Sequence, residues 1–205
     1  MNPSTTEASK KRETENCVAK NQAANEAYVQ KEYPGEKFIG STAGLEKAHK
    51  YTKGLEIAKG VKVAESRLPV NSRQRSILRN ELHQAEILTR FGNSVYLLPE
   101  IGSHKKRLLD AVVNGQLFEF RMATGNSRTL EWTFGDAKKK GDATNVFISV
   151  ESDIPKKEAR RRVSQVLKRH PEYTGKIVLS IPSGKTIKTG EITYNIFFWN
   201  SDALR

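Results

Sequence analysis

The chain has 205 residues, with 35 lysines and arginines against 23 aspartates and glutamates, and a formal net charge of +12. This length allows one domain with a substantial core, and the charge favours a polyanionic partner, nucleic acid first and an acidic membrane surface second. The composition argues against a disulfide-stapled scaffold, since Cys17 is the single cysteine, and no run approaches the roughly 18 apolar residues that span a bilayer.

The N-terminal part of the sequence is polar and predicts little structure of its own. Residues 1–35 are dominated by Ser, Thr, Glu, Lys, Asn and Gln, and only a weak helix is expected around 17–30. Apolar residues recur every three or four positions over 44–61, which predicts a packing helix. We therefore expect residues 1–70 to form a polar, partly helical N-terminal region.

From residue 71 onward the sequence alternates clear helix and strand patterns. Asn71 or Ser72 can cap a helix that runs through Arg90, and Asn-Gly at 114–115 predicts a tight hairpin. Helices interleaved with strands predict an α/β domain over 71–205, a mixed sheet flanked by helices. The other expected elements are a strand at 94–98, a helix from Asn126 or Ser127 to Lys140, a strand at 145–150, a helix at 156–169, and strands at 176–181 and 192–199.

The hairpin carries the most informative polar residues. Asp110 and Glu119 flank the Asn-Gly turn, so that their carboxylates can lie side by side on neighbouring strands. Glu119 and Arg121 are expected on one face, because side chains alternate along a strand. Two acids and a cation in this arrangement suit a divalent metal or a phosphodiester. The same pattern also describes an ordinary cross-strand ion pair.

The stretch from Glu81 to Ile181 resembles the PD-(D/E)xK, or restriction-endonuclease-like, nuclease superfamily. The resemblance lies in Glu81-Leu-His-Gln-Ala-Glu-Ile-Leu on the first helix, then Asp110-Ala-Val-Val-Asn-Gly, and then Glu119-Phe-Arg121. The variant most similar is found in C-terminal toxin domains of contact-dependent growth inhibition proteins and in related phage and mobile-element proteins. That family's core is a helix and a strand, a hairpin bearing the catalytic acids, a helix and a further strand.

The resemblance implies a role for each acidic residue. Asp110 and Glu119 would hold Mg²⁺ or Mn²⁺, which lowers the pKa of bound water, and Glu81 would be an additional helix-borne acid. Family members usually have lysine where Arg121 stands, and leucine rather than proline precedes Asp110 here. Arginine stays protonated and offers a planar fork to phosphate oxygens, so Arg121 can stabilise charge but cannot act as a base.

Several basic segments are candidates for nucleic-acid binding. One is a basic loop directly before the hairpin, one is the start of the helix after it, and one is an arginine run on the helix at 156–169. His104 also supports a metal-independent alternative, in which it acts with Glu119 and Arg121 on RNA. The candidate binding residues are His104, Lys105, Lys106, Arg107, Ser127, Arg128, Arg160 and Arg161.

The sequence thus predicts a metal-dependent nuclease that acts on RNA, with tRNA as a substrate class implied by the resemblance and DNA as the rival. The resemblance also implies an interbacterial toxin with an acidic cognate immunity protein. We expect a cytoplasmic site of action, no signal peptide, and delivery as part of a larger secreted protein if the chain is exported. The rival function is a noncatalytic nucleic-acid-binding protein of a phage or mobile element.

Overall fold

The computed structural model describes residues 3–99, 109–124, 127–139, 144–151, 154–185 and 192–200. The chain divides into two compact units, Met1–Leu117 and Phe118–Arg205. The boundary expected between residues 70 and 71 therefore falls inside the first unit, where elements from both sides of it share one sheet. None of the described helices is both long and apolar enough to cross a membrane.

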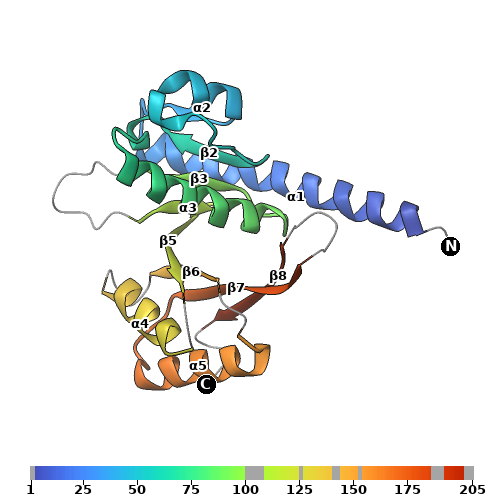
Figure 1. Cartoon of the computed structure of the whole chain (residues 1–205), viewed down its shortest axis with the longest axis vertical. Coiled ribbons are helices and arrows are strands. Elements are labelled where there is room, and N and C mark those ends of the chain that lie inside the picture. Colours follow the sequence, from blue (N-terminus) through green and yellow to red (C-terminus); the bar gives the residue numbers. More distant parts are fainter. Residues whose placement is uncertain are drawn as a thin grey trace. The chain divides into compact units, whose positions relative to one another are not determined.

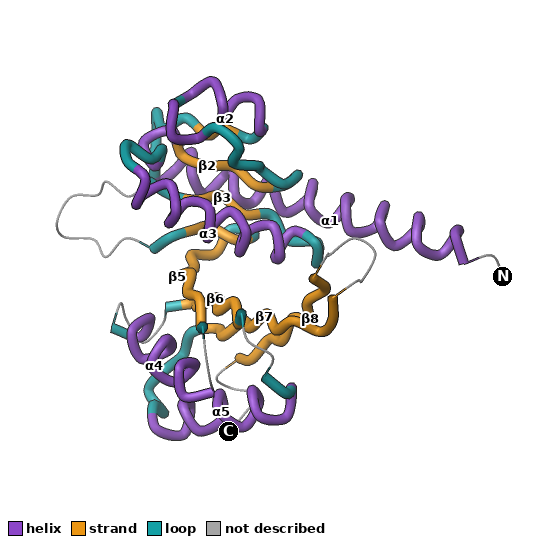
Figure 2. The backbone as a smooth tube through the Cα atoms, in the orientation of Figure 1, coloured by secondary structure: helices purple, strands orange, loops and turns teal. Residues whose placement is uncertain are grey.

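Unit 1 contains a mixed sheet between two helices (Figures 1 and 2). Strand β1 (Phe38–Ile39) pairs antiparallel with β2 (Val61–Ala64), β2 pairs parallel with β3 (Val95–Leu97), and β3 pairs antiparallel with β4 (Ala111–Val113). The helices of this unit are α1 (Pro3–Glu32), α2 (Thr42–Ala48) and α3 (Ser72–Thr89), with 3-10 turns at Lys50–Thr52 and Glu65–Arg67.

Helix α1 is a structural part of unit 1, in contrast to the polar leader expected from its sequence. Val29 packs with Tyr96 and Val112 on one face of the sheet, whereas α3 contacts β2 and β3. The fully buried Asn25 donates a hydrogen bond to Ser94 Oγ (3.1 Å) and accepts one from the Gly115 N–H (2.7 Å). The helix is thus held by buried polar contacts, which an apolar periodicity does not reveal.

A glycine allows α1 to lie this close to the strands. Gly60 has a φ of 92°, and a Cβ at this position would collide with Val18 Cγ1 of α1. Gly92 (φ 81°) lies against Cys17, and its carbonyl accepts a hydrogen bond from Asn21 Nδ2 (2.8 Å). Glycine tolerates positive φ and has no side chain, so Gly60 and Gly92 can adopt these φ values and leave room for α1 without a steric clash.

The prediction of a single helix over 44–61 is wrong. Helix α2 ends at Ala48, and His49 is extended, with a φ of −157° and a ψ of 150°. The hydroxyl of buried Thr52 donates to the Leu45 carbonyl (2.5 Å), which competes with helix continuation. Gly54 then adopts a φ of 68°, and the apolar residues from Val61 form the unexpected strand β2.

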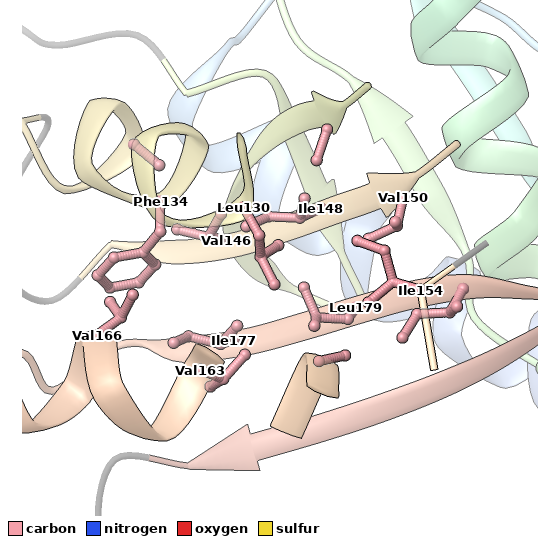
Figure 3. Packing of buried hydrophobic residues seen from close by; sticks show 14 of the residues in the cluster. Leu130, Phe134, Val146, Ile148, Val150, Ile154, Val163, Val166, Ile177 and Leu179 are labelled. Atoms are coloured by element: carbon pink, nitrogen blue, oxygen red, sulfur yellow. The ribbon is translucent and has the colours of Figure 1, made fainter. Parts of the chain in front are cut away.

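Unit 2 begins within β5 (Gln116–Ala123), and its described residues form three further strands and two helices. Strands β5, β6 (Asn145–Val150) and β7 (Lys176–Lys185) are parallel, and β8 (Ile192–Asn200) pairs antiparallel with β7. Helices α4 (Ser127–Lys138) and α5 (Lys156–Arg169) supply Phe134, Val163 and Val166 to a core against β6 and β7 (Figure 3).

The expected α/β class, with a mixed sheet flanked by helices, is confirmed. The helix expected at 156–169 and the strand expected at 145–150 have the bounds of α5 and β6. Helix α3 begins after the Asn71 cap, whose side chain accepts a hydrogen bond from the Gln74 N–H (2.9 Å). Among the apolar residues of α3, Leu78, Leu82, Ala85 and Leu88 are buried, whereas Ile77 is exposed at 41%.

Candidate functional site

Two of the predicted acids meet at one buried arginine in unit 1. Arg67 Nε lies 3.0 Å from Glu81 Oε2, and its Nη2 lies 2.6 Å from Glu81 Oε1. The same Nη2 is 3.5 Å from Asp110 Oδ1. Arg67 is 6% exposed and Glu81 is 8% exposed. The guanidinium thus makes a bidentate ion pair with Glu81 and also faces Asp110.

Backbone contacts fix this cluster where three elements meet. Arg67 ends the 3-10 turn that follows β2, Glu81 lies in the middle of α3, and Asp110 directly precedes β4. Arg67 Nη1 donates to the Leu98 carbonyl (2.5 Å), and the Leu98 N–H donates to the Asp110 carbonyl (2.9 Å). The arginine is therefore tied to the same segment that positions the aspartate.

Ion pairing offsets the burial of the charged groups in this cluster. One guanidinium faces two carboxylates in a largely buried setting, where each charge needs a partner to offset its desolvation. A planar guanidinium suits this position because it can bind one carboxylate with two parallel hydrogen bonds and still contact another. The cluster holds Glu81 and Asp110 near each other in spite of their like charge.

The other predicted acid forms an ion pair inside unit 2. Glu119 is fully buried and pairs with Arg121, whose side chain is 33% exposed. Their register partners on β6 are Val146 and Ile148, which belong to the core beneath α4 and α5. Glu119 and Arg121 thus share the helix-covered face of β5, which confirms their expected placement on one face.

An exposed acid on α4 extends this charge pattern. Lys139, which lies 2.6 Å from Asp136, holds the pKa of the Asp136 carboxyl below its usual value. The nearby Arg121 contributes to the same lowering. The charge of Arg121 therefore stabilises the carboxylates of both Glu119 and Asp136.

The basic run on α5 is partly neutralised by acids of its own unit. Arg161 binds Glu158 (2.7 and 2.8 Å), and Arg162 binds both Glu158 (2.8 Å) and Glu131 of α4 (2.9 Å). These arginine hydrogen bonds lower the pKa of Glu158 to about 2. Arg160 is exposed on the same helix. Structural ion pairs thus account for much of what the sequence suggested as a phosphate-binding run.

The structure describes only part of the remaining predicted binding residues. His104, Lys105, Lys106 and Arg107 fall outside the described residues. Ser127 and Arg128 begin α4, as expected, but their side chains are outside the described part.

Arg67 is the site residue that sequence reasoning missed. It lies in Glu-Ser-Arg-Leu-Pro, a segment without a motif, and on the N-terminal side of the predicted domain boundary. The segment Val61–Ala64 just before it, apolar except for Lys62, was the available signal, because a strand there would have brought Arg67 to the sheet.

The donor chemistry of Asp110 and Glu119 fits an oxygen-preferring divalent ion, since carboxylates are the usual protein ligands of Mg²⁺. Among the described residues, no group of three or more His, Cys, Asp or Glu side chains is arranged to hold a metal. Each carboxylate instead has a guanidinium close by, Arg67 at Asp110 and Arg121 at Glu119.

Comparison with models of known protein families, with curated protein sequences and with solved structures gave no match to this chain.

Proposed function

We propose that the chain is a nuclease that cleaves phosphodiester bonds of RNA. The observation that carries the proposal is the convergence on Arg67 of Glu81, from helix α3, and Asp110, the residue before β4, two acids that sequence reasoning had assigned to one site. The order α3, β3, β4, β5, α4, β6 supports it further. It agrees with the helix, strand, hairpin, helix, strand order of the superfamily that the sequence resembles.

The proposed reaction uses a divalent metal, Mg²⁺ or Mn²⁺, for which Asp110 would be a ligand in unit 1. When bound, such an ion lowers the pKa of a coordinated water and offsets negative charge on the phosphate. The planar guanidinium of Arg121 would donate hydrogen bonds to phosphate oxygens and orient Glu119. Arg67 is a positioning residue, which keeps Glu81 and Asp110 in place through their shared guanidinium.

The biological role that fits this activity is that of an interbacterial toxin acting on RNA in the cytoplasm of a target cell, with tRNA as the first substrate class. Such a protein requires an inhibitor in the producing cell. The net charge of +12 makes an acidic immunity protein the natural partner, because opposite charges speed association.

The test is cleavage of total RNA and plasmid DNA by the purified chain, with Mg²⁺ or with EDTA. Asp110→Asn and Glu119→Gln preserve shape and remove one charge each. They should lower the rate by a factor on the order of 10²–10³, as expected for loss of one charge-stabilising group. Glu65→Gln is a matched control, since Glu65 is exposed in the same unit as Asp110. Arg121→Lys introduces the residue that the resembled family carries, and should retain or raise activity.

Each outcome of this assay has a distinct meaning. Metal-dependent cleavage that both acid variants lose supports the proposal. Cleavage that persists in EDTA but is lost in His104→Ala favours the metal-independent mechanism with His104, Glu119 and Arg121. Nucleic-acid binding with no cleavage under any condition favours the noncatalytic alternative. The pairing of Arg121 with buried Glu119 motivates that alternative, because an internal ion pair can keep an acid from metal.

A further inference from the structure

A cavity of about 360 Å³ lies in unit 1, next to the helix that carries Glu81. Four residues of α3 border it, Arg79, Leu82, His83 and Glu86, and their spacing of three and four positions places them on one helix face. Glu81 reaches Arg67 on a different face. The cavity is therefore separate from the acid cluster. Its volume falls within the range of about 300–1,000 Å³ typical of small-molecule pockets.

The opposite wall of the cavity is a loop that its own contacts hold in place. Residues 54–58 form this wall together with Thr42, whose Oγ1 accepts a hydrogen bond from the Ile57 N–H (3.0 Å). Gly54 and Gly60 have φ values of 68° and 92°, so the loop turns at points before and after this wall. Leu55 is 2% exposed and fixes the loop to the core. The cavity is thus largely preformed.

The lining combines an apolar floor with planar and charged groups. Leu55 and Leu82 are buried and supply the floor. Arg79 and His83 of the lining have flat polar side chains, and Glu56 of the loop has a carboxylate. A ligand suited to this lining is flat and apolar on its faces, and it carries both hydrogen-bond donors and acceptors on its edge. These are the properties of a nucleobase.

We propose that this cavity binds one unstacked guanine base of single-stranded RNA. Guanine presents O6 and N7 as acceptors for a guanidinium, and its N1–H and amino group as donors for a carboxylate. Arg79 and Glu56 supply these two partners. Single-stranded RNA is commonly read through bases that are splayed out of the stack, and flat side chains hold them. The inference rests on the proposed ribonuclease function and adds a base preference to it.

The experiment titrates the four nucleoside 5′-monophosphates separately into the full chain, with amide NMR shifts as the readout. GMP should give saturable shifts at Ile57 and Ala58, and AMP, CMP and UMP should bind more weakly. Arg79→Gln and Glu56→Gln should each weaken GMP binding at least about tenfold, as for loss of one good base contact. Arg73→Gln is the matched control, because it removes the same charge from an exposed α3 position that does not line the cavity.

A cavity-filling variant tests whether GMP binds in this cavity. Ala58→Phe places a ring in the cavity from the loop and should abolish the GMP shifts while circular dichroism stays native. The same variant should reduce cleavage at guanines in RNA. Binding of none of the four nucleotides, equal binding of all four, or GMP binding that survives Ala58→Phe would overturn the inference. Asp110→Asn separates the two proposals, since it should lose cleavage and keep GMP binding. A wild-type chain that binds GMP but cleaves nothing would refute the nuclease proposal alone.

Discussion

Replacing Arg67 by methionine is the sharpest test of the buried acid cluster. Methionine keeps much of the side-chain length and removes the charge, so Glu81 loses both hydrogen bonds of its bidentate pair and Asp110 loses the facing cation. Removal of one partner from a buried ion pair costs about 3–5 kcal/mol, because the remaining charge stays desolvated. For a chain of this size, we expect the melting temperature to fall by roughly 6–20 °C.

The assay is urea unfolding followed by far-UV circular dichroism and by tryptophan fluorescence. Both tryptophans, Trp132 and Trp199, belong to unit 2. Circular dichroism therefore reports on both units, and fluorescence reports on unit 2. The Arg67→Met transition should move to lower urea by circular dichroism. The exposed α3 variant Arg73→Met is the control, and its stability should change by no more than about 0.5 kcal/mol.

A double variant shows whether the lost energy comes from charge. In Arg67→Met with Glu81→Gln, the side chain facing the methionine is neutral, so we expect at least half of the loss to be recovered. A destabilisation of Arg67→Met below about 1 kcal/mol would refute the reasoning, because it would mean that the carboxylates do not depend on the guanidinium. The absence of any recovery in the double variant would refute it equally.

Three further predictions concern α1, the core of unit 2 and its pH dependence. Gly60→Ala should destabilise by about 1–3 kcal/mol in urea unfolding, since its Cβ meets Val18 at positive φ, and Val18→Ala in the same chain should restore part of the loss. Tyr173→Phe should cost about 1–3 kcal/mol in the same assay, because it leaves the buried Thr144 carbonyl without the phenol that donates to it; an unchanged midpoint would show that the bond contributes nothing. The pKa of Glu158 is lowered from 4.5 to about 2, so its ion pairs add stability above pH 4.5 and lose it as the pH falls toward 2. Glu158→Gln should flatten the pH dependence of the melting temperature in that interval, and an identical slope in both proteins would contradict this.

Where apolar periodicity was strong, the sequence was sufficient to predict the fold. Val163 and Val166 recur at helical spacing on α5, and β6 is apolar along nearly its whole length. Such elements form because burial of their apolar side chains dominates the energy. Sequence reasoning could therefore find most of unit 2 and helix α3 with nearly correct bounds.

Where polar contacts determine the structure, the sequence was insufficient. Helix α1 is held by Asn25 and by glycines that lie far away in the chain, and α2 ends because Thr52 and Gly54 compete with helical geometry. The same reason explains the candidate site. Asp110 and Glu119 were found from the hairpin pattern, whereas Arg67 became visible only once β2 was known to bring it beside Leu98.

The position of Arg67 has a practical consequence for dissecting the protein. A fragment starting at residue 71 would look like a natural catalytic unit, because it retains every acid named from the sequence. It would nevertheless lack the guanidinium that Glu81 binds, as well as α1, β1 and β2. Glu81 would then lose its bidentate partner and Asp110 a facing cation, and an inactive or insoluble fragment would say nothing about the chemistry of the intact chain.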